Sequence, residues 1–574
     1  MLRESLDRIF VAAVGQAFPE MAPLAHAEVT PATDAKFGDY QCNLAMKLAK
    51  PLQRSPRQVA EAIMQSVQEE PLIGRLEIAG PGFINIHLSP LAISQCVTGL
   101  LESGGMGLVV PQPRQRIVID FSSPNTAKEM HVGHLRSTII GDALARLFEA
   151  LDQDVLRLNH IGDWGTAFGM LIAYIKEHAP AVLQGEHAVE LATLVQWYRQ
   201  SKALFDQDLR FRKAAQMEVV ALQGGDPEAR RAWGLICEVS RIAYQQVYDL
   251  LEIRLKERGE SFYQPMLAEI VKEFEAKGLV AVSDGARCIF LDGFVNREGD
   301  PLPLMVQKSD GGYNYDTTDL AAMKQRIEEE KADRIIIVTD AGQAQHFAMI
   351  AAAGEKAGWF SSRPVRFDHV PFGLVLGPDG KKFRTRSGET ERLVDLLGDA
   401  TEAATKMVTE RHPDWSQEEI TNTGLAIGIN AVKYADLVSH RVKDYHYSSE
   451  RMLRFEGNTA PFLLYSYVRA KSILRRLPPP PKQVTVDLRA TSEIRLGILL
   501  LQFPEILLSV AEDLLPHRLA DYLYRLADAF NAFFRDCHVE GTPEQESRAG
   551  LVKLTERILG KGLQILGLRL LERM

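Results

Sequence analysis

The sequence predicts a multidomain protein that consists of an α+β N-terminal domain, an α/β domain with a helical insertion, and an all-α C-terminal domain. Three observations lead to this fold class. The chain has 574 residues and is 46% hydrophobic, which is enough for several separate cores. A strand–helix–strand pattern follows residue 116, and such a unit predicts a parallel sheet with a right-handed crossover. From about residue 397 the pattern is nearly all helical.

The expected N-terminal domain spans residues 1–112. It opens with an amphipathic helix and ends with a strand-like alternation over residues 82–88. The step Pro111-Gln112-Pro113 that follows is typical of a linker.

The expected α/β domain spans residues 113–400. Its first unit is a β-branched strand, a helix and a second strand, at residues 116–121, 135–151 and 155–158. Residues from about 188 to 251 contain few turn breakers and are predicted to be a helical insertion. Strand signals return further along the chain, each followed by a helical stretch, at residues 288–291 and 334–338.

The expected C-terminal domain spans residues 401–574. Four prolines at 478–481 have helical patterns on both sides, so they predict a stiff loop rather than a domain linker. The most apolar stretch, at residues 496–515, contains Pro504, two glutamates, a glutamine and an aspartate. It therefore falls short of the roughly 20 clean apolar residues of a membrane span, and no membrane association is expected.

Charge and cysteine content narrow the class of protein. The formal net charge is −9, from 75 acidic and 66 basic side chains, which excludes nucleic-acid binding by bulk positive charge but not by a local basic face. The five cysteines form no C-x-x-C pair, so neither a disulfide framework nor a cysteine zinc site is expected. Because Glu4 and Asp7 interrupt any early apolar run, we expect a cytoplasmic protein.

The densest group of reactive residues lies at 121–137, between a predicted strand and a predicted helix. Parallel sheets place their ligand crevice at such a junction, and a helix N-terminus favours phosphate. His131 and His134 are three residues apart and can face one ligand, while Gly133 allows a flat base to approach the backbone. Two alternatives stay open here: a capped helix start with two surface histidines, or a metal pair, for which no third ligand stands at the usual spacing.

The residues around this pair resemble a known family. His131-Val132-Gly133-His134 matches the HIGH signature of class I aminoacyl-tRNA synthetases, and the Ser-Pro-Asn-x-Ala-Lys string at 123–128 resembles arginyl-tRNA synthetases. The resemblance covers essentially the whole chain, including the motifs at residues 36–41, 162–165 and 455–458. It implies a Rossmann-type catalytic domain at 113–400, an anticodon-binding domain at 401–574, and an N-terminal domain that contacts the tRNA D-loop.

The resemblance also implies the catalytic residues. The segment 380–388 resembles a degenerate KMSKS loop, whose mobile positive charge would meet the triphosphate as it is attacked. The lysine expected late in that loop is replaced by residues such as Thr385, and Lys128 is expected to compensate. On its own, such a basic run is typical of a solvated loop. The expected catalytic residues are Lys128, His131, His134, Lys382, Arg384 and Arg386, and those expected to bind ATP are His131, Gly133, His134 and Lys382.

A pocket for arginine must hold a flat cation, which carboxylates in a fork geometry and a neutral acceptor suit best. Tyr315 and Asp319 are four residues apart, so on one helical turn they point the same way. Without the resemblance, each candidate is more typical of a surface or capping residue. The expected arginine-binding residues are Ser123, Asn125, His131, Glu260, Tyr315, Asp319 and Gln343.

Binding of tRNA by an acidic protein needs a local group of basic and aromatic residues. The stretch 465–476 supplies both, although an amphipathic core helix with a charged outer face has the same pattern. The resemblance implies contacts to a D-loop base from the N-terminal domain and to the anticodon from the C-terminal domain. The expected tRNA-binding residues are Phe83, Asn85, Tyr465, Arg469 and Met574.

The resemblance implies that the chain joins arginine to ATP and passes the arginyl group to the 3′ end of tRNA-Arg. The substrate carboxylate attacks the α-phosphorus, with Mg²⁺ as the counterion of ATP; no protein-bound zinc is expected, and we expect a monomer. Two alternatives are a class I synthetase for another amino acid and a noncatalytic tRNA-binding paralogue. A glutamate pocket would offer basic side chains in place of Glu260 and Asp319, and a paralogue would be expected to have lost His131, His134 or Lys128, all of which are present.

Overall fold

A computed structural model describes residues 1–24, 28–32, 34–108, 110–185, 188–296, 298–361, 363–377, 380, 392–478 and 484–574. The chain divides into two compact units. One unit combines Met1–Val109 with Arg454–Gln564 and Arg569–Met574, and the other combines Val110–Leu453 with Ile565–Leu568.

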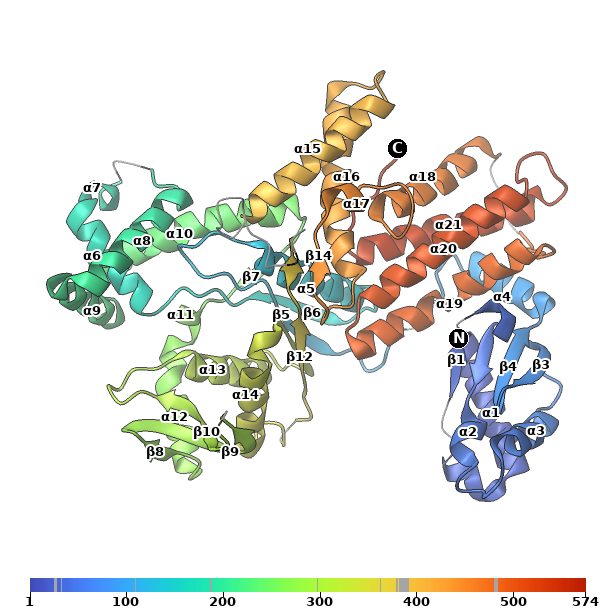
Figure 1. Cartoon of the computed structure of the whole chain (residues 1–574), viewed down its shortest axis with the longest axis horizontal. Coiled ribbons are helices and arrows are strands. Elements are labelled where there is room, and N and C mark those ends of the chain that lie inside the picture. The colour runs from blue at the N-terminus through green and yellow to red at the C-terminus, as the bar shows by residue number, and fades with distance from the viewer. Residues whose placement is uncertain are drawn as a thin grey trace. The chain divides into compact units, whose positions relative to one another are not determined.

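The second unit is built on a five-stranded sheet in which every neighbouring pair is parallel, with the order β12-β11-β5-β6-β7 (Figure 1). The strands are β5 (Arg116–Asp120), β6 (Asp154–Asn159), β7 (Lys256–Glu257), β11 (Arg334–Asp340) and β12 (Arg366–Phe372). The strand order reverses between β5 and β11, as in doubly wound nucleotide-binding folds. The Rossmann-type α/β fold predicted from the sequence is therefore confirmed.

Helix α5 (Val132–Ala150) connects β5 to β6 and lies close to the sheet. A Cβ added at Gly141 would come within 2.2 Å of the Phe121 ring, so glycine permits this close approach. Helices α13 (Tyr315–Glu328) and α14 (Ala344–Lys356) contribute Leu320 and Ile350 to the same buried core as strand residues Val118 and Ile335. Burial of these apolar side chains is the main driving force for packing helices on the sheet.

The helical insertion lies between β6 and β7. Residues 188–251 form most of it, but two helices begin earlier, so the helical part exceeds the predicted segment at its N-terminal side. Its helices are α6 (Thr166–His178), α7 (Pro180–Leu183), α8 (Leu191–Gln207), α9 (Leu209–Gly224) and α10 (Pro227–Leu250). Asp208 and Asp226 cap α9 and α10 by accepting backbone N–H groups of the first turn, which explains why the chain breaks at these positions.

The strand signal at 288–291 is real, but the strand does not belong to the parallel sheet. It lies in β9 (Ala286–Val295), which pairs antiparallel with β8 (Ala281–Ser283) and β10 (Pro301–Gln307). Asp284 and Gly285 both have positive φ and close a two-residue hairpin between β8 and β9. Such a turn fits an antiparallel pair, whereas a parallel pair needs a crossover. Helices α11 (Glu260–Tyr263) and α12 (Leu267–Ala276) precede this small sheet.

The unit that contains the sheet continues to Leu453. The domain limit expected at residue 400 remains a prediction. The last elements of this unit are β13 (Val375–Leu376), α15 (Leu393–Arg411), α16 (Gln417–Leu437), β14 (Tyr445–His446) and α17 (Ser449–Met452). The two short strands pair in parallel. Arg136 of α5 and Asp436 of α16 form an ion pair at 3.1 Å with both side chains buried.

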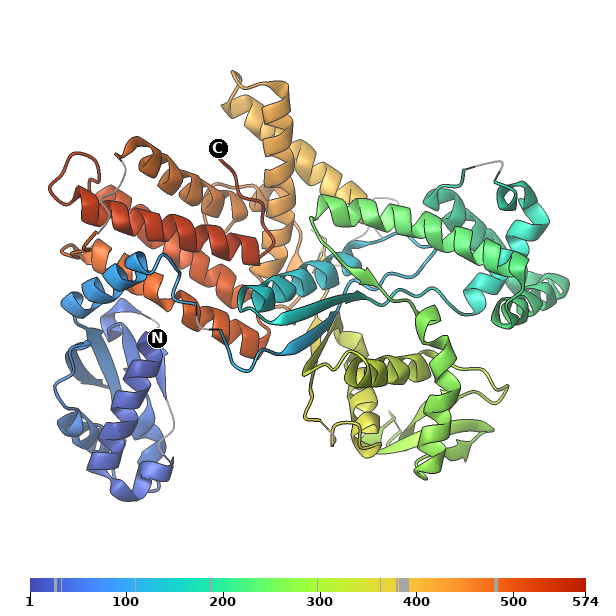
Figure 2. The ribbon, with the colours of Figure 1, turned by 180° about the vertical axis from the view of Figure 1, so that it is seen from behind.

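The N-terminal part of the other unit is α+β, as predicted, and is blue in Figure 2. Its antiparallel sheet has the order β1-β2-β4-β3. Its elements are α1 (Leu2–Ala17), β1 (Val29–Pro31), β2 (Tyr40–Cys42), α2 (Leu44–Leu48), α3 (Pro56–Ser66), β3 (Ile73–Ala79), β4 (Phe83–Leu88) and α4 (Pro90–Glu102). The predicted strand at 82–88 corresponds to β4.

The C-terminal part of that unit is all α-helical, as predicted. It consists of α18 (Ala460–Arg476), α19 (Thr491–Asp513), α20 (His517–Asp536) and α21 (Gln545–Ile565). Among the described helices, α19 is long and apolar enough to cross a membrane. Its Leu496, Leu500, Phe503 and Leu507 are buried, and it contacts α20 and α4, so protein packing accounts for its apolar composition. Of the predicted proline loop, residues 479–481 lie outside the described residues.

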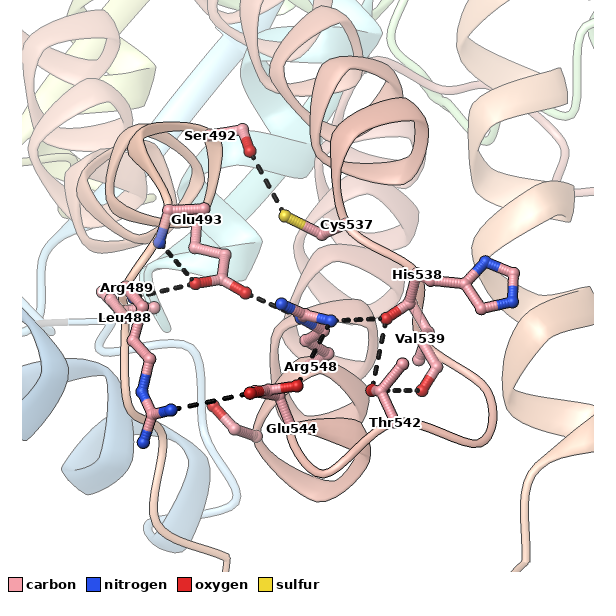
Figure 3. Close-up of polar contacts among 12 residues, drawn as sticks. Leu488, Arg489, Ser492, Glu493, Cys537, His538, Val539, Thr542, Glu544 and Arg548 are labelled. Atoms are coloured by element: carbon pink, nitrogen blue, oxygen red, sulfur yellow. Dashed lines mark hydrogen bonds and ion pairs between the residues drawn. The ribbon is translucent and has the colours of Figure 1, made fainter.

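A buried polar network joins the start of α19 to the turn between α20 and α21 (Figure 3). One carboxylate oxygen of Glu493 accepts the backbone N–H groups of Arg489 and Ala490, each at 2.8 Å. The other accepts from Nε of Arg548 at 2.8 Å, and Arg548 Nη1 donates to the His538 carbonyl at 2.7 Å. The Glu493 carboxylate thus satisfies the helix start and fixes the turn, and these contacts lower its pKa despite burial.

Candidate active site

A cavity of about 930 Å³ opens at the carboxyl ends of β5 and β11, where the strand order reverses. Ligands of open α/β sheets bind at this position. The cavity brings together all the residues expected to bind arginine and three of those expected to bind ATP. These lining residues are Ser123, Asn125, His131, Gly133, His134, Glu260, Tyr315, Asp319 and Gln343.

The two histidines of the signature both cap α5. Nδ1 of His131 accepts the Gly133 N–H at 3.0 Å, and Nδ1 of His134 accepts the His131 N–H at 3.1 Å. Burial, together with the charges of His131 and Lys128, lowers the pKa of His134 to about 3. His134 is therefore neutral, and because Nδ1 accepts, its proton sits on Nε2. This side chain therefore caps α5 through Nδ1 and carries a proton on Nε2.

The segment between β5 and α5 has a strained backbone that its neighbours hold in place. Ser122, Ser123 and Ala127 have φ values of 76°, 50° and 59°. Ser123 donates its N–H to Asn159 Oδ1 at 2.9 Å and its Oγ–H to Asp120 Oδ1 at 3.1 Å. Non-glycine residues with positive φ cluster at functional sites, where the surrounding contacts maintain them.

Close packing against Asn125 accounts for the glycine at the first position of the motif at 162–165. A Cβ at this position would lie 2.2 Å from Oδ1 of Asn125. The two segments exchange backbone hydrogen bonds, from Thr126 N–H to the Gly162 carbonyl and from Gly162 N–H to the Pro124 carbonyl. Gly162 therefore allows Asn125 to reach the cavity.

One side of the cavity holds carboxylates close enough to repel one another, an arrangement that favours binding of a cation. Burial and the neighbouring carboxylates of Asp163 and Asp319 raise the pKa of Glu260 to about 7. Asp163 is itself held by Ser261, whose N–H and Oγ–H donate to it at 2.8 and 2.6 Å. Tyr315 and Asp319 lie one turn apart in α13, as the four-residue spacing predicted. A bound cation would relieve the repulsion among these carboxylates.

Several cavity-lining residues were not singled out from the sequence. They are Asp120, Arg136, His160, Asp340 and His346. Asp120 and Asp340 end β5 and β11, so a polar residue at the carboxyl end of a parallel strand would have been a usable signal. Asp120 also accepts from the buried Arg326 of α13 at 2.5 Å, a contact that no local pattern reveals.

Lys128 does not line the cavity. Its Nζ lies 5.7 Å from the centre of the Tyr198 ring, in the helical insertion. Its charge nevertheless contributes to the lowered pKa of His134, which lines the cavity. The expected loop residues Lys382, Arg384 and Arg386 lie outside the described residues.

The residues expected to bind tRNA differ in exposure. Arg469 lies over the Tyr465 ring at 4.6 Å and the Phe534 ring at 5.1 Å, and both rings are 40% exposed. By contrast, Asn85 on β4 is 2% exposed, and its Oδ1 accepts from Gln41 at 2.7 Å. Phe83 and Met574 are half-buried.

No group of three or more His, Cys, Asp or Glu side chains is placed to hold a metal ion in the described parts of the chain. The five cysteines are free, and only Cys96 among them is exposed.

Comparison with known proteins gives the class and then the family. Residues 96–449 match the family model described as tRNA synthetases class I (R), catalytic domain, so the protein is a class I tRNA synthetase. Residues 4–88 match the arginyl tRNA synthetase N-terminal domain, and 463–574 match the DALR anticodon binding domain. The chain belongs to the arginyl-tRNA synthetase family, which confirms the resemblance carried by residues 123–134.

Relatives of this chain cover it end to end. The arginine--tRNA ligase of Protochlamydia amoebophila is 56% identical over 99% of both chains, and that of Chlamydia pneumoniae is 50% identical over 98% of both. The arginyl-tRNA synthetase structure from Plasmodium falciparum has a TM-score of 0.87 and 32% identity, covering 100% of this chain and 99% of that one. The Thermus thermophilus structure, at 24% identity and a TM-score of 0.80 over 100% of both chains, shows the same fold.

Proposed function

We propose that this chain is an arginine--tRNA ligase. It activates arginine with ATP to arginyl-adenylate, releasing pyrophosphate, and transfers the arginyl group to the 3′ end of tRNA-Arg. The observation that carries this proposal is one cavity that contains both the histidine-capped start of α5 and the carboxylates of Glu260 and Asp319. Membership of the arginyl-tRNA synthetase family supports it.

Activation needs no nucleophile from the protein, because the carboxylate of arginine attacks the α-phosphorus of ATP. The chain contributes position and charge. The start of α5 offers a helix N-terminus to the phosphates, and Nε2–H of His134 offers a hydrogen-bond donor. Lys128 and the basic loop residues Lys382, Arg384 and Arg386 neutralise charge as pyrophosphate leaves. Mg²⁺ accompanies ATP as its counterion.

Recognition of the arginine side chain falls to the acidic wall. Glu260 and Asp319 offer oxygens to the guanidinium, and Tyr315 and Gln343 line the same cavity. Ser123, Asn125 and His131, from the segment between β5 and α5, contact the amino and carboxylate groups of the substrate arginine. A planar cation with five fixed donors suits this arrangement better than an ammonium does.

The remaining assignments concern the partners and the location. We propose that tRNA-Arg stacks on Tyr465 beside Arg469, with Met574 contributing, and that the N-terminal domain contacts the D-loop through Phe83. Asn85, expected to share this contact, is buried and bonded to Gln41, so a direct contact from it would require that bond to open. Exposed aromatic rings next to a cation suit unpaired bases and phosphate. We further propose that the protein works as a monomer in the cytoplasm.

Aminoacylation of bulk tRNA with each proteinogenic amino acid in turn tests the proposed function. Charging with arginine alone is the expected result. Charging with a different amino acid would favour a class I synthetase of other specificity, and no charging at all would favour a noncatalytic tRNA-binding paralogue.

Arginine affinity is expected to depend on pH through Glu260. With a pKa of about 7, its carboxyl is mostly protonated at pH 6 and must lose that proton to pair with a guanidinium. The arginine dissociation constant should therefore fall about tenfold between pH 6 and pH 8. Calorimetry in buffers of different ionisation enthalpy should detect proton release. A Glu260→Gln enzyme with the same pH dependence as wild type would assign the proton to another group.

Replacing Asp319 by asparagine is expected to raise the KM for arginine by roughly 30- to 150-fold, because a charge-assisted contact to the guanidinium becomes a neutral one. The KM for ATP should change little. Steady-state aminoacylation with each substrate varied separately measures both constants. An unchanged arginine KM, or an equal effect on ATP, would remove Asp319 from the pocket.

A further inference from the structure

His346 lies in the first turn of α14 and lines the cavity that the proposed function assigns to arginine. Both of its ring nitrogens contact carboxylates of α13. Nε2 lies 2.6 Å from Oδ2 of Asp319, and Nδ1 lies 3.2 Å from Oδ1 of Asp316. The imidazole therefore bridges two acidic side chains, one of which is an expected arginine ligand.

The contacts of this ring favour its protonated form. Nε2 shares a hydrogen bond with Asp319 at 2.6 Å and Nδ1 lies in ion-pair range of Asp316 at 3.2 Å, and two carboxylates on opposite sides of an imidazole stabilise the imidazolium. Although burial lowers the pKa of His346, the hydrogen bonds and charges of Asp316 and Asp319 raise it to about 9. The Tyr315 ring lies edge-on at 5.2 Å and the Phe347 ring at 4.9 Å, which limits rotation of the imidazole.

Asp316 anchors this bridge to the protein. It is 7% exposed, and its second oxygen, Oδ2, accepts from Nδ2 of Asn314 at 3.0 Å. His346 is thus held at Nδ1 by a fixed carboxylate and uses Nε2 to hold Asp319. This bond uses Oδ2 of Asp319, so Oδ1 is the oxygen that can accept a hydrogen bond from a ligand.

We propose that His346 is a positioning residue for arginine specificity, which orients the Asp319 carboxylate toward the guanidinium. Within the bridge, two carboxylates and one imidazolium carry a net charge of −1, so Asp319 still offers one negative charge to the guanidinium beside that of Glu260. Without the imidazolium, Asp316 and Asp319 would repel each other, and Asp319 would lose its fixed orientation. This inference rests on the proposed function, because it assumes that arginine binds at Asp319.

Two substitutions separate the two ends of the bridge. The amide nitrogen of glutamine reaches the position of Nε2, so His346→Gln keeps a donor for Asp319. The amide nitrogen of asparagine reaches only the position of Nδ1, so His346→Asn keeps a donor for Asp316 and loses the one for Asp319. Both substitutions remove the ring and the charge. Asparagine also fills less volume than glutamine, so a role in packing alone predicts a melting temperature lowered more by His346→Asn and KM values for arginine and ATP that change together.

The test measures KM for arginine and for ATP, and kcat, in aminoacylation by the full-length protein. His346→Asn is expected to raise the arginine KM roughly 10- to 100-fold, the scale of one charge-assisted hydrogen bond, and His346→Gln by less than about fivefold. The ATP KM and kcat at saturating arginine should stay within about threefold. Matched controls are His412→Asn and His412→Gln, since His412 stacks on Trp415 and is not among the cavity-lining residues.

Equal arginine KM values for the two His346 variants, or a KM near that of wild type for His346→Asn, would overturn the inference. If His346→Asn does not fold, as judged by its melting temperature, His346→Gln still decides: an arginine KM raised more than about tenfold contradicts the positioning role. These outcomes differ from failure of the proposed function, in which the wild-type protein would not charge arginine at all.

Discussion

Replacing Lys128 by alanine is expected to lower the single-turnover rate of arginyl-adenylate formation by roughly 10²- to 10³-fold, the scale for removing one group that stabilises a transition state. In the structure the ammonium rests near the Tyr198 ring, yet its charge already acts on His134. Its long flexible side chain can leave that ring when phosphate charge develops beside α5. Arginine affinity should barely change, because Lys128 does not line the cavity.

A rescue experiment tests whether Lys128 compensates for the departure at Thr385. Thr385→Lys in the Lys128→Ala background should recover part of the rate, because an ammonium can reach one phosphate from either side of the crevice. Lys202→Ala is a matched control, since Lys202 is a half-exposed lysine of the insertion that pairs with Asp206. A Lys128→Ala protein that is folded by circular dichroism and adenylates at the wild-type rate would contradict this role.

His134→Asn is expected to reduce the rate of adenylate formation by a similar 10²- to 10³-fold. The reason lies in the two nitrogens of the ring. Nδ1 accepts the His131 N–H, and Nε2 carries the proton that can be donated at the cavity. Asparagine offers an oxygen at the first position but no donor at the second, so it preserves the helix cap and removes the proposed contact to ATP.

Two further measurements accompany this substitution. The melting temperature should stay close to that of wild type, because the cap is kept. The rate loss should be the same between pH 6 and pH 8, because a pKa of about 3 keeps His134 neutral over this range. A loss that grows or shrinks across this range would mean that the ring acts through a charged form.

The strands and helix that position the site follow from local sequence. The β-branched run at 116–121 and the helical pattern that starts beside His131 predict β5 and α5, and parallel pairing then places their junction at the ligand crevice. His131, Gly133 and His134 line the cavity at this junction.

Other features depend on contacts that no local pattern encodes. The strand at 288–291 has the periodicity of a sheet strand, but periodicity does not say which sheet it joins; the turn at Asp284-Gly285 decides that. His346 reaches Asp319 only because α13 and α14 pack together, and its spacing of three residues from Gln343 is a weak signal. Asn85 matches a family position, yet its burial follows from the pairing of β4 with β2.

We propose that the cavity at the carboxyl ends of β5 and β11 activates arginine by recognising its guanidinium. Pyrophosphate exchange with ATP, measured with tRNA present, tests it most directly when arginine is compared with lysine and with citrulline, the neutral analogue of nearly the same shape. We expect exchange with arginine and only background exchange with the other two, because the acidic wall requires a planar cation. Comparable exchange with citrulline or lysine, or none with arginine, would contradict it.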